Sequence, residues 1–223
     1  MSYDSFITEV NTEFRQEKFF SFWKRYGLWV IVAAIVLVLS VTVYQIYHYK
    51  QMNKASALGD AFIKSLDLAG SHDFDEAMGQ LEKVKASDFG AYPFLARLRE
   101  ASLLMEQGDA VKSVETFDAV AADEKAPLIL RKVAKIRAAY ILVDTGTLDD
   151  VKKRVEDMAN DSDPMHLSAR EALGLAAYKA NQMDDAVSYF QKIFEEGSLG
   201  IKITERAKIM LELLQSMGKA NKR

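Results

Sequence analysis

The sequence predicts an all-α chain: one membrane-spanning helix, then an α-solenoid of about four helical hairpins and a capping helix. The 223 residues include only three prolines and 11 glycines, and helix formers such as Ala, Leu, Glu and Lys fill long segments. One stretch near the N-terminus carries no charge over 21 residues, and a pattern of small and apolar residues recurs four times after it. These three observations favour helices throughout.

The chain is expected to begin with a short cytoplasmic tail, residues 1–26. Ile7, Val10 and Phe14 would fall on one stripe of a helix there. The simpler interpretation is a helix beside the membrane that only orients the span after it. The alternative is a docking site for a cytoplasmic or membrane partner. We favour the first.

Residues 27–47 form the predicted transmembrane helix. At about 1.5 Å per residue, this uncharged run would extend roughly 32 Å, which matches the hydrocarbon thickness of a bilayer. A buried core helix is rarely apolar on all sides in a domain of this size. Aromatic residues of the kind that favour the membrane–water interface stand near both ends of the run: Trp23, Tyr26, Trp29, and then Tyr44, Tyr47 and Tyr49.

A cleaved signal peptide is the main alternative for this run. Its apolar region would span about 7–15 residues after a short basic segment, whereas the segment before Gly27 contains four acidic residues. The Ala-Ser-Ala sequence at 55–57 resembles a cleavage site, but it lies well beyond the run, after Lys50 and Lys54. The sequence therefore favours an uncleaved anchor.

The distribution of basic residues favours a cytoplasmic N-terminus. Four precede the run and two follow it closely: Arg15, Lys18, Lys24, Arg25, and then Lys50 and Lys54. Under the positive-inside rule the large C-terminal part would lie across the membrane. In a bacterial inner membrane, that side is the periplasm.

Four stretches after the anchor repeat one pattern, in which a small or short residue is followed by apolar residues four and seven positions later. Such residues share one helical face. In register, the four sets are Ala77, Leu81 and Val84; Ser113, Phe117 and Val120; Val151, Val155 and Met158; and Ala186, Phe190 and Ile193. The first members are 36, 38 and 35 residues apart, a period that indicates stacked helical hairpins.

The clearest unit, residues 166–197, resembles a tetratricopeptide repeat. Gly174 stands twelve residues before Ala186, and Tyr178 and Phe190 are the bulky apolar members. The resemblance implies two antiparallel helices that touch at small residues, with a large ring in the space beside them.

Two units depart from this pattern. The first has Ser65 where a small Gly or Ala of the first helix is expected, and the third has Val151 where Ala is usual. The repeat domain is expected to occupy residues 48–217, followed by a basic tail, 218–223.

The helix containing the anchor should continue without a break to about Ala69, because no proline interrupts it. The later helices are expected at Phe74–Ala86, Pro93–Gln107, Ala110–Ala122, Pro127–Asp144, Leu148–Ala159, Pro164–Ala180, Met183–Glu196 and Ile203–Met217. The last would cover the open end of the stack. Three helices should begin near a proline in the first turn, and Asp163 is the expected N-cap before Pro164.

The sequence contains no recognisable catalytic, metal or cofactor site, and we expect a protein that is not an enzyme. The mildly acidic net charge of −3 disfavours nucleic-acid binding. The chain has no cysteine, and His48, His72 and His166 lack second ligands at metal-binding spacing. The acidic stretch 157–164 lacks the glycine and final glutamate of a calcium loop.

A partner-binding surface is the remaining candidate site. In tetratricopeptide arrays the first helix of each pair lines the concave side, where the first unit would place Phe62 and Leu66. The other units give the candidate groove residues Leu95, Leu98, Met105, Ile136, Tyr140, Val143, Leu175 and Tyr178. Either these residues form an apolar groove for a polypeptide, or the terminal helix and tight curvature bury them.

The whole layout resembles the ancillary subunit family of the SecYEG translocon. The resemblance rests on the WKRYG-type approach to the membrane, the single anchor and a repeat domain of this size. It implies an inner-membrane protein whose repeat domain lies in the periplasm. Its partners would be the translocon, a membrane-anchored prolyl isomerase-like chaperone, and unfolded clients as they emerge. The alternative is an anchored scaffold for another envelope complex, in cell-wall synthesis or division.

Overall fold

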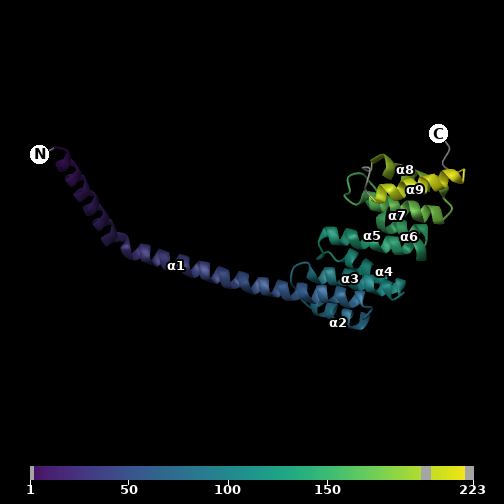
Figure 1. Cartoon of the computed structure of the whole chain (residues 1–223), viewed down its shortest axis with the longest axis horizontal. Helices are drawn as coiled ribbons and strands as arrows, with labels where there is room; N and C mark the ends of the chain where they lie inside the picture. The colour runs from purple at the N-terminus through teal and green to yellow at the C-terminus, as the bar shows by residue number, and fades with distance from the viewer. Residues whose placement is uncertain (1–2, 197–201, 219–223) are drawn as a thin grey trace. The chain divides into compact units, whose positions relative to one another are not determined.

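The computed structural model describes residues 3–196 and 202–218, with side chains of the first helix from Trp23 onward. Within these ranges the chain is entirely α-helical apart from turns and one short 3₁₀ helix, which confirms the predicted fold class (Figure 1). The elements are α1 Tyr3–Gly70, α2 Phe74–Lys85, α3 Tyr92–Glu106, α4 Ala110–Ala122, α5 Leu128–Thr145, α6 Leu148–Val155, η1 Glu156–Met158, α7 His166–Lys179, α8 Met183–Glu196 and α9 Lys202–Ser216.

The chain divides into two compact units, residues 1–56 and residues 57–223. Helix α1 belongs to both, since it continues through the apolar run without a break to Gly70, as predicted. The side chains of the proposed stripe at Ile7, Val10 and Phe14 lie outside the described residues, and so does the basic tail after Gly218.

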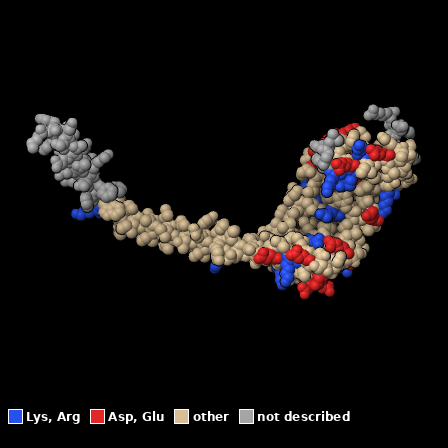
Figure 2. Space-filling view, viewed as in Figure 1, with Lys and Arg blue, Asp and Glu red and all other residues tan. Residues whose placement is uncertain are grey.

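The first unit contains a helix that is long and apolar enough to cross a membrane. Its apolar window has a mean hydropathy of 2.5, and every side chain from Leu28 to Lys50 is exposed within the unit. Figure 2 shows this stretch as almost wholly uncharged. The hydroxyls of Ser40 and Thr42 donate to the carbonyls of Val36 and Val38, so both are satisfied without water.

The second unit is built from helix pairs in the register that the sequence pattern predicts. All twelve register residues, in α2, α4, α6, η1 and α8, are 0–2% exposed. The small positions of the paired helices, Ser65, Ala101, Ala139 and Gly174, are also buried. The pattern therefore marks the faces on which each pair closes.

Small residues set how closely the helices approach. A methyl group on Gly174 would lie 2.9 Å from the Phe190 ring, so only glycine lets this ring reach the backbone of α7. In the second unit, the Ser113 hydroxyl donates to the Ala101 carbonyl at 2.6 Å. Serine thus serves in place of alanine at this seam, because its hydroxyl finds an acceptor in the facing helix.

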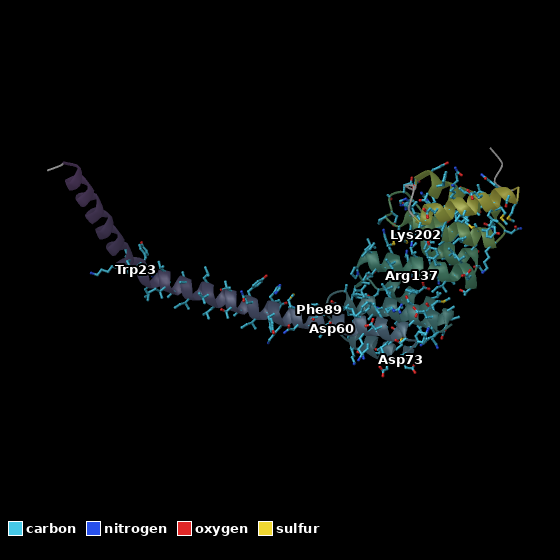
Figure 3. All side chains as sticks on the ribbon, in the orientation of Figure 1. Trp23, Asp60, Asp73, Phe89, Arg137 and Lys202 are labelled. Carbon is cyan, nitrogen blue, oxygen red and sulfur yellow. The ribbon has the colours of Figure 1, made fainter. Side chains whose placement is uncertain are left out.

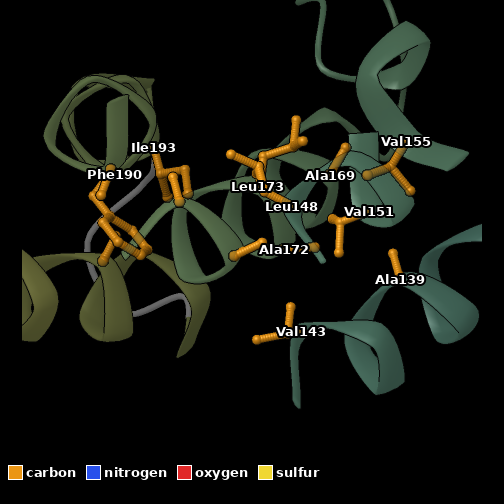
Figure 4. Close-up of a cluster of buried hydrophobic side chains, with 14 of the residues drawn as sticks. Ala139, Val143, Leu148, Val151, Val155, Ala169, Ala172, Leu173, Phe190 and Ile193 are labelled. Carbon is orange, nitrogen blue, oxygen red and sulfur yellow. The ribbon is translucent and has the colours of Figure 1, made fainter. Parts of the chain in front are cut away.

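The pairs stack into one continuous array with two layers. Helices α3, α5, α7 and α9 contact one another in sequence along the inner layer. Helices α2, α4, α6 and α8 pack outside them. In the largest core, Ala172 and Leu173 of α7 lie between Phe190 and Ile193 of α8 and the valines of α6 (Figure 4).

Several predicted helix boundaries are wrong by a few residues. Only Pro93 lies in a first turn; Pro127 is itself the N-cap of α5, and Pro164 precedes α7 by two residues. The N-cap of α7 is Met165, and Asp163 instead accepts the Met165 N–H within the preceding turn. Helix α6 ends at Val155, and the chain continues as η1.

We expect Gly174→Ala to destabilise the protein although alanine is the better helix former. Overpacking against Phe190 should cost roughly 1–3 kcal/mol, which outweighs the gain of about 0.5–1 kcal/mol in helix propensity. The matched control is Gly79→Ala in α2, where the new methyl meets open space and should stabilise by about 0.4–1 kcal/mol. Urea unfolding of the full chain in detergent measures both, and equal effects would contradict the packing described.

Asp163 is expected to make stability depend on acidic pH. Its carboxylate accepts Lys132 Nζ at 2.6 Å. Burial alone would raise the pKa of this carboxyl, but the hydrogen bonds from Lys132 and from the Met165 N–H hold the pKa below its usual value. The ionised carboxylate of Asp163 therefore contributes to the free energy of unfolding above the unfolded pKa of about 3.9. This contribution is lost as the pH falls through the lower folded pKa.

The variant Asp163→Asn should therefore be less stable than wild type at pH 7. Its deficit should shrink as the pH falls from about 5 towards 2. Glu115→Gln, at an exposed site on α4, is the control and should follow the wild-type profile. A deficit that is independent of pH would mean that the carboxylate charge at Asp163 is not the stabilising feature.

Candidate partner-binding groove

Two hollows lie along the inner layer and share the side chain of Tyr140. The first, of about 530 Å³, lies between α3, α4 and α5. Its lining residues are Ser102, Met105, Glu106, Ile136, Arg137 and Tyr140, together with Phe117 and Ile141. The second, of about 420 Å³, lies between α5, α7 and α9, and is lined by Tyr140, Glu171, Leu175, Arg206, Ile209 and Met210. We call the two hollows together the inner groove.

The inner groove brings together four of the eight residues singled out from the sequence. Met105, Ile136 and Tyr140 line the first hollow, and Leu175 joins Tyr140 in the second. Met105 is 40% exposed, whereas Ile136 is mostly buried in the core beneath it.

The other four candidates line neither hollow. Leu98 and Val143 are buried in core clusters, at 9% exposure each. Leu95 and Tyr178 are half-buried. Helical periodicity identifies the inner helices, but it does not separate side chains that face a neighbouring helix from those that face the groove.

Sequence reasoning missed the contribution of α9. Arg206, Ile209 and Met210 form one wall of the second hollow, and Ile209 is 62% exposed. The residues that α9 buries against the array include Ala207, Leu211 and Leu214. The sequence signal was available, because Ile209, Leu213 and Met217 form a second apolar stripe beside this buried one.

A buried carboxylate connects the walls of the second hollow. Glu171 of α7 accepts hydrogen bonds from the Tyr140 hydroxyl and, at 2.5 and 2.7 Å, from Nε and Nη2 of Arg206. Its side chain is 3% exposed, whereas that of Arg206 is 54% exposed. Burial and then the hydrogen bond to Glu171 raise the pKa of Tyr140 well above its ordinary value, so its hydroxyl remains a donor.

One basic side chain in the inner groove has no ion-pair partner among the described residues. Glu106 pairs with Arg99 at 3.0 Å, and Arg206 pairs with Glu171. Among the described residues, Arg137 forms no ion pair with a neighbouring acid, and it is exposed. Figure 3 labels Arg137 on the repeat unit, and Figure 2 shows both basic and acidic side chains scattered among uncharged ones on the face of that unit.

The histidines and acidic residues do not assemble elsewhere into a metal site within the described part of the chain. Asp157 of η1 and two acids in the loop before α7, Asp161 and Asp163, instead pair with Lys135, Arg170 and Lys132, respectively. These pairs fasten the loop to helices α5 and α7. His166 Nε2 lies 3.1 Å from Glu196 and bridges α7 to α8.

Comparison with known proteins identifies one family. A family model described as a tetratricopeptide repeat-like domain matches residues 21–213. No curated protein and no solved structure matches the chain. The match covers most of the sequence, including the apolar run and all the helix pairs.

The Glu171–Arg206 pair should respond unequally to removal of its two partners. Arg206→Met leaves a buried carboxylate with only the Tyr140 hydroxyl, which should cost about 3 kcal/mol, at the low end for a broken buried pair because Arg206 itself is half exposed. Glu171→Gln leaves an arginine that can turn to solvent, and should cost about 1 kcal/mol. Urea unfolding measures both, and a larger loss for Glu171→Gln would contradict the burial assigned to these groups.

Proposed function

The chain belongs to the tetratricopeptide repeat-like family, and on that premise we propose that it is a membrane-anchored protein-interaction module. Domains of this family are interaction modules rather than enzymes as a rule. The observation that carries the proposal is the inner groove, where the exposed side chains of Met105 and Ile209 flank Tyr140. Apolar side chains left exposed around a concave surface are typical of a binding site.

We further propose that the protein is an ancillary, chaperone-like adaptor of the SecYEG translocon. Its repeat unit would lie in the periplasm of a bacterial cell, with the N-terminus in the cytoplasm. Three sequence features support this: the WKRYG-type approach, the single apolar helix and the excess of basic residues before it. The partners would then be the translocon, a membrane-anchored prolyl isomerase-like chaperone, and proteins emerging between them.

Anchoring gives this arrangement a physical advantage. A module fixed to the same membrane as its partner meets it at an effective concentration that free diffusion does not provide. A groove of modest affinity can therefore hold a partner at the translocon exit. A scaffold for another envelope complex would use the same advantage, so the identity of the partner decides between the two functions.

The proposed topology predicts an asymmetric protease pattern. Protease added to spheroplasts should digest residues 57–223, while a tag at the N-terminus stays protected. Intact cells, in which the outer membrane excludes the protease, should protect both and serve as the control. Protection of the repeat unit in spheroplasts would show that the topology is the opposite of the proposed one, and would contradict a role at the translocon exit.

Purification from detergent extracts should recover the partners. We expect SecYEG subunits and a prolyl isomerase-like protein with the wild type, and about tenfold less of them with Met105→Glu, equivalent to about 1.4 kcal/mol. Val111→Glu, at a 70% exposed position on outer helix α4, is the matched control and should retain them. Recovery of cell-wall or division proteins instead would support the scaffold function.

A further inference from the structure

We infer that the partner element bound by the inner groove is an amphipathic α-helix that carries an acidic residue beside its apolar face. This inference rests on the proposed function, since it specifies what the interaction module binds. It follows from the polar groups of the groove, from the charge at Arg137 and from the placement of the two hollows.

Most polar groups that line the groove already have hydrogen-bond or ion-pair partners within the protein. The Ser102 hydroxyl donates to the Leu98 carbonyl at 3.1 Å, and the Tyr140 hydroxyl donates to Glu171. Glu171 also forms an ion pair with Arg206, and Glu106 forms one with Arg99. Among the described lining residues, Arg137 is the one charged donor without an acidic partner.

A partner chain in an extended conformation would fit the inner groove poorly. A strand laid in the groove would bury peptide N–H and C=O groups against an apolar lining, and each unpaired group is costly. The helical walls offer no sheet edge to pair with them. A helix satisfies its own backbone internally, so it can present only side chains to such a lining.

The positive charge of Arg137 favours an acidic residue beside the apolar stripe of the partner helix. Arg137 stands in the first hollow beside Met105 and Ile136, where its guanidinium can pair with a partner carboxylate through charge-assisted hydrogen bonds. Arg206 is half exposed at the second hollow, although it already holds Glu171. A partner helix with Asp or Glu next to its apolar stripe would complement Arg137, whereas a basic helix would be repelled.

The two hollows fit successive anchors on one helix. The hollows lie on either side of Tyr140. Their separation is therefore one to two helix–helix spacings, or roughly 10–20 Å. That distance corresponds to about two to four helical turns. A helix of about 15 residues can therefore place apolar side chains in both hollows and an acid near Arg137.

The test selects 16-residue peptides from a random display library on the full-length protein in detergent micelles, with empty micelles used to remove membrane binders. We expect enriched sequences with apolar residues at i, i+3 or i+4 and i+7 and an adjacent Asp or Glu. A synthetic peptide of the enriched sequence should become helical on binding. Its affinity should fall about tenfold or more for Arg137→Glu, and should be unchanged for Lys192→Glu at an exposed site on outer helix α8.

Other results would overturn the inference in distinguishable ways. Enriched apolar runs without helical spacing would identify an extended or unfolded segment as the ligand, and equal affinity for Arg137→Glu would remove the charge requirement. Self-association through the groove, seen by sedimentation and abolished by Met105→Glu, would make a second copy the occupant. In these cases partners recovered from cells would still support the interaction function. That function fails separately if neither peptides nor cellular partners depend on the groove.

Discussion

The close contact of paired helices at small residues is the constraint on which the repeat unit depends. Ala77, Ser113 and Ala186 are fully buried in the outer helices, and each lies twelve residues after a small residue of the helix it faces. Where the backbones approach, a ring or branched side chain can enter the space beside them, as Phe190 does against Gly174. Each pair still exposes apolar surface on its flanks, so the pairs stack, and the inner layer follows from that stacking.

The inner groove depends on the polar contacts that hold the inner helices together. The carboxylate of Glu171 ties α5, α7 and α9 together through Tyr140 and Arg206, which fixes the terminal helix as a wall instead of a lid. Apolar residues then remain exposed at Met105 and Ile209. A surface of this kind suits a partner that brings its own satisfied backbone.

The sequence was sufficient to predict the repeat register, because small residues with apolar neighbours at four and seven positions have few structural alternatives. The continuity of α1 was also predictable, since nothing between the apolar run and Gly70 interrupts a helix. Of the eight candidate residues singled out from the sequence, four line the two hollows. Leu98 and Val143 share helical faces with Met105 and Tyr140, and the choice between core and groove depends on side-chain packing between helices. Proline positions misled the helix boundaries, because Pro127 and Pro164 lie in the turns before α5 and α7.

The most direct measurement is site-specific photo-crosslinking in cells at two exposed apolar positions. A crosslinker in place of Met105, in the inner groove, should capture another membrane-associated protein through a segment with a helical apolar pattern. The same crosslinker in place of Val111, on outer helix α4, should yield no such product. Intramolecular products alone at Met105, or equal capture at both positions, would contradict the assignment of the inner groove as the binding surface.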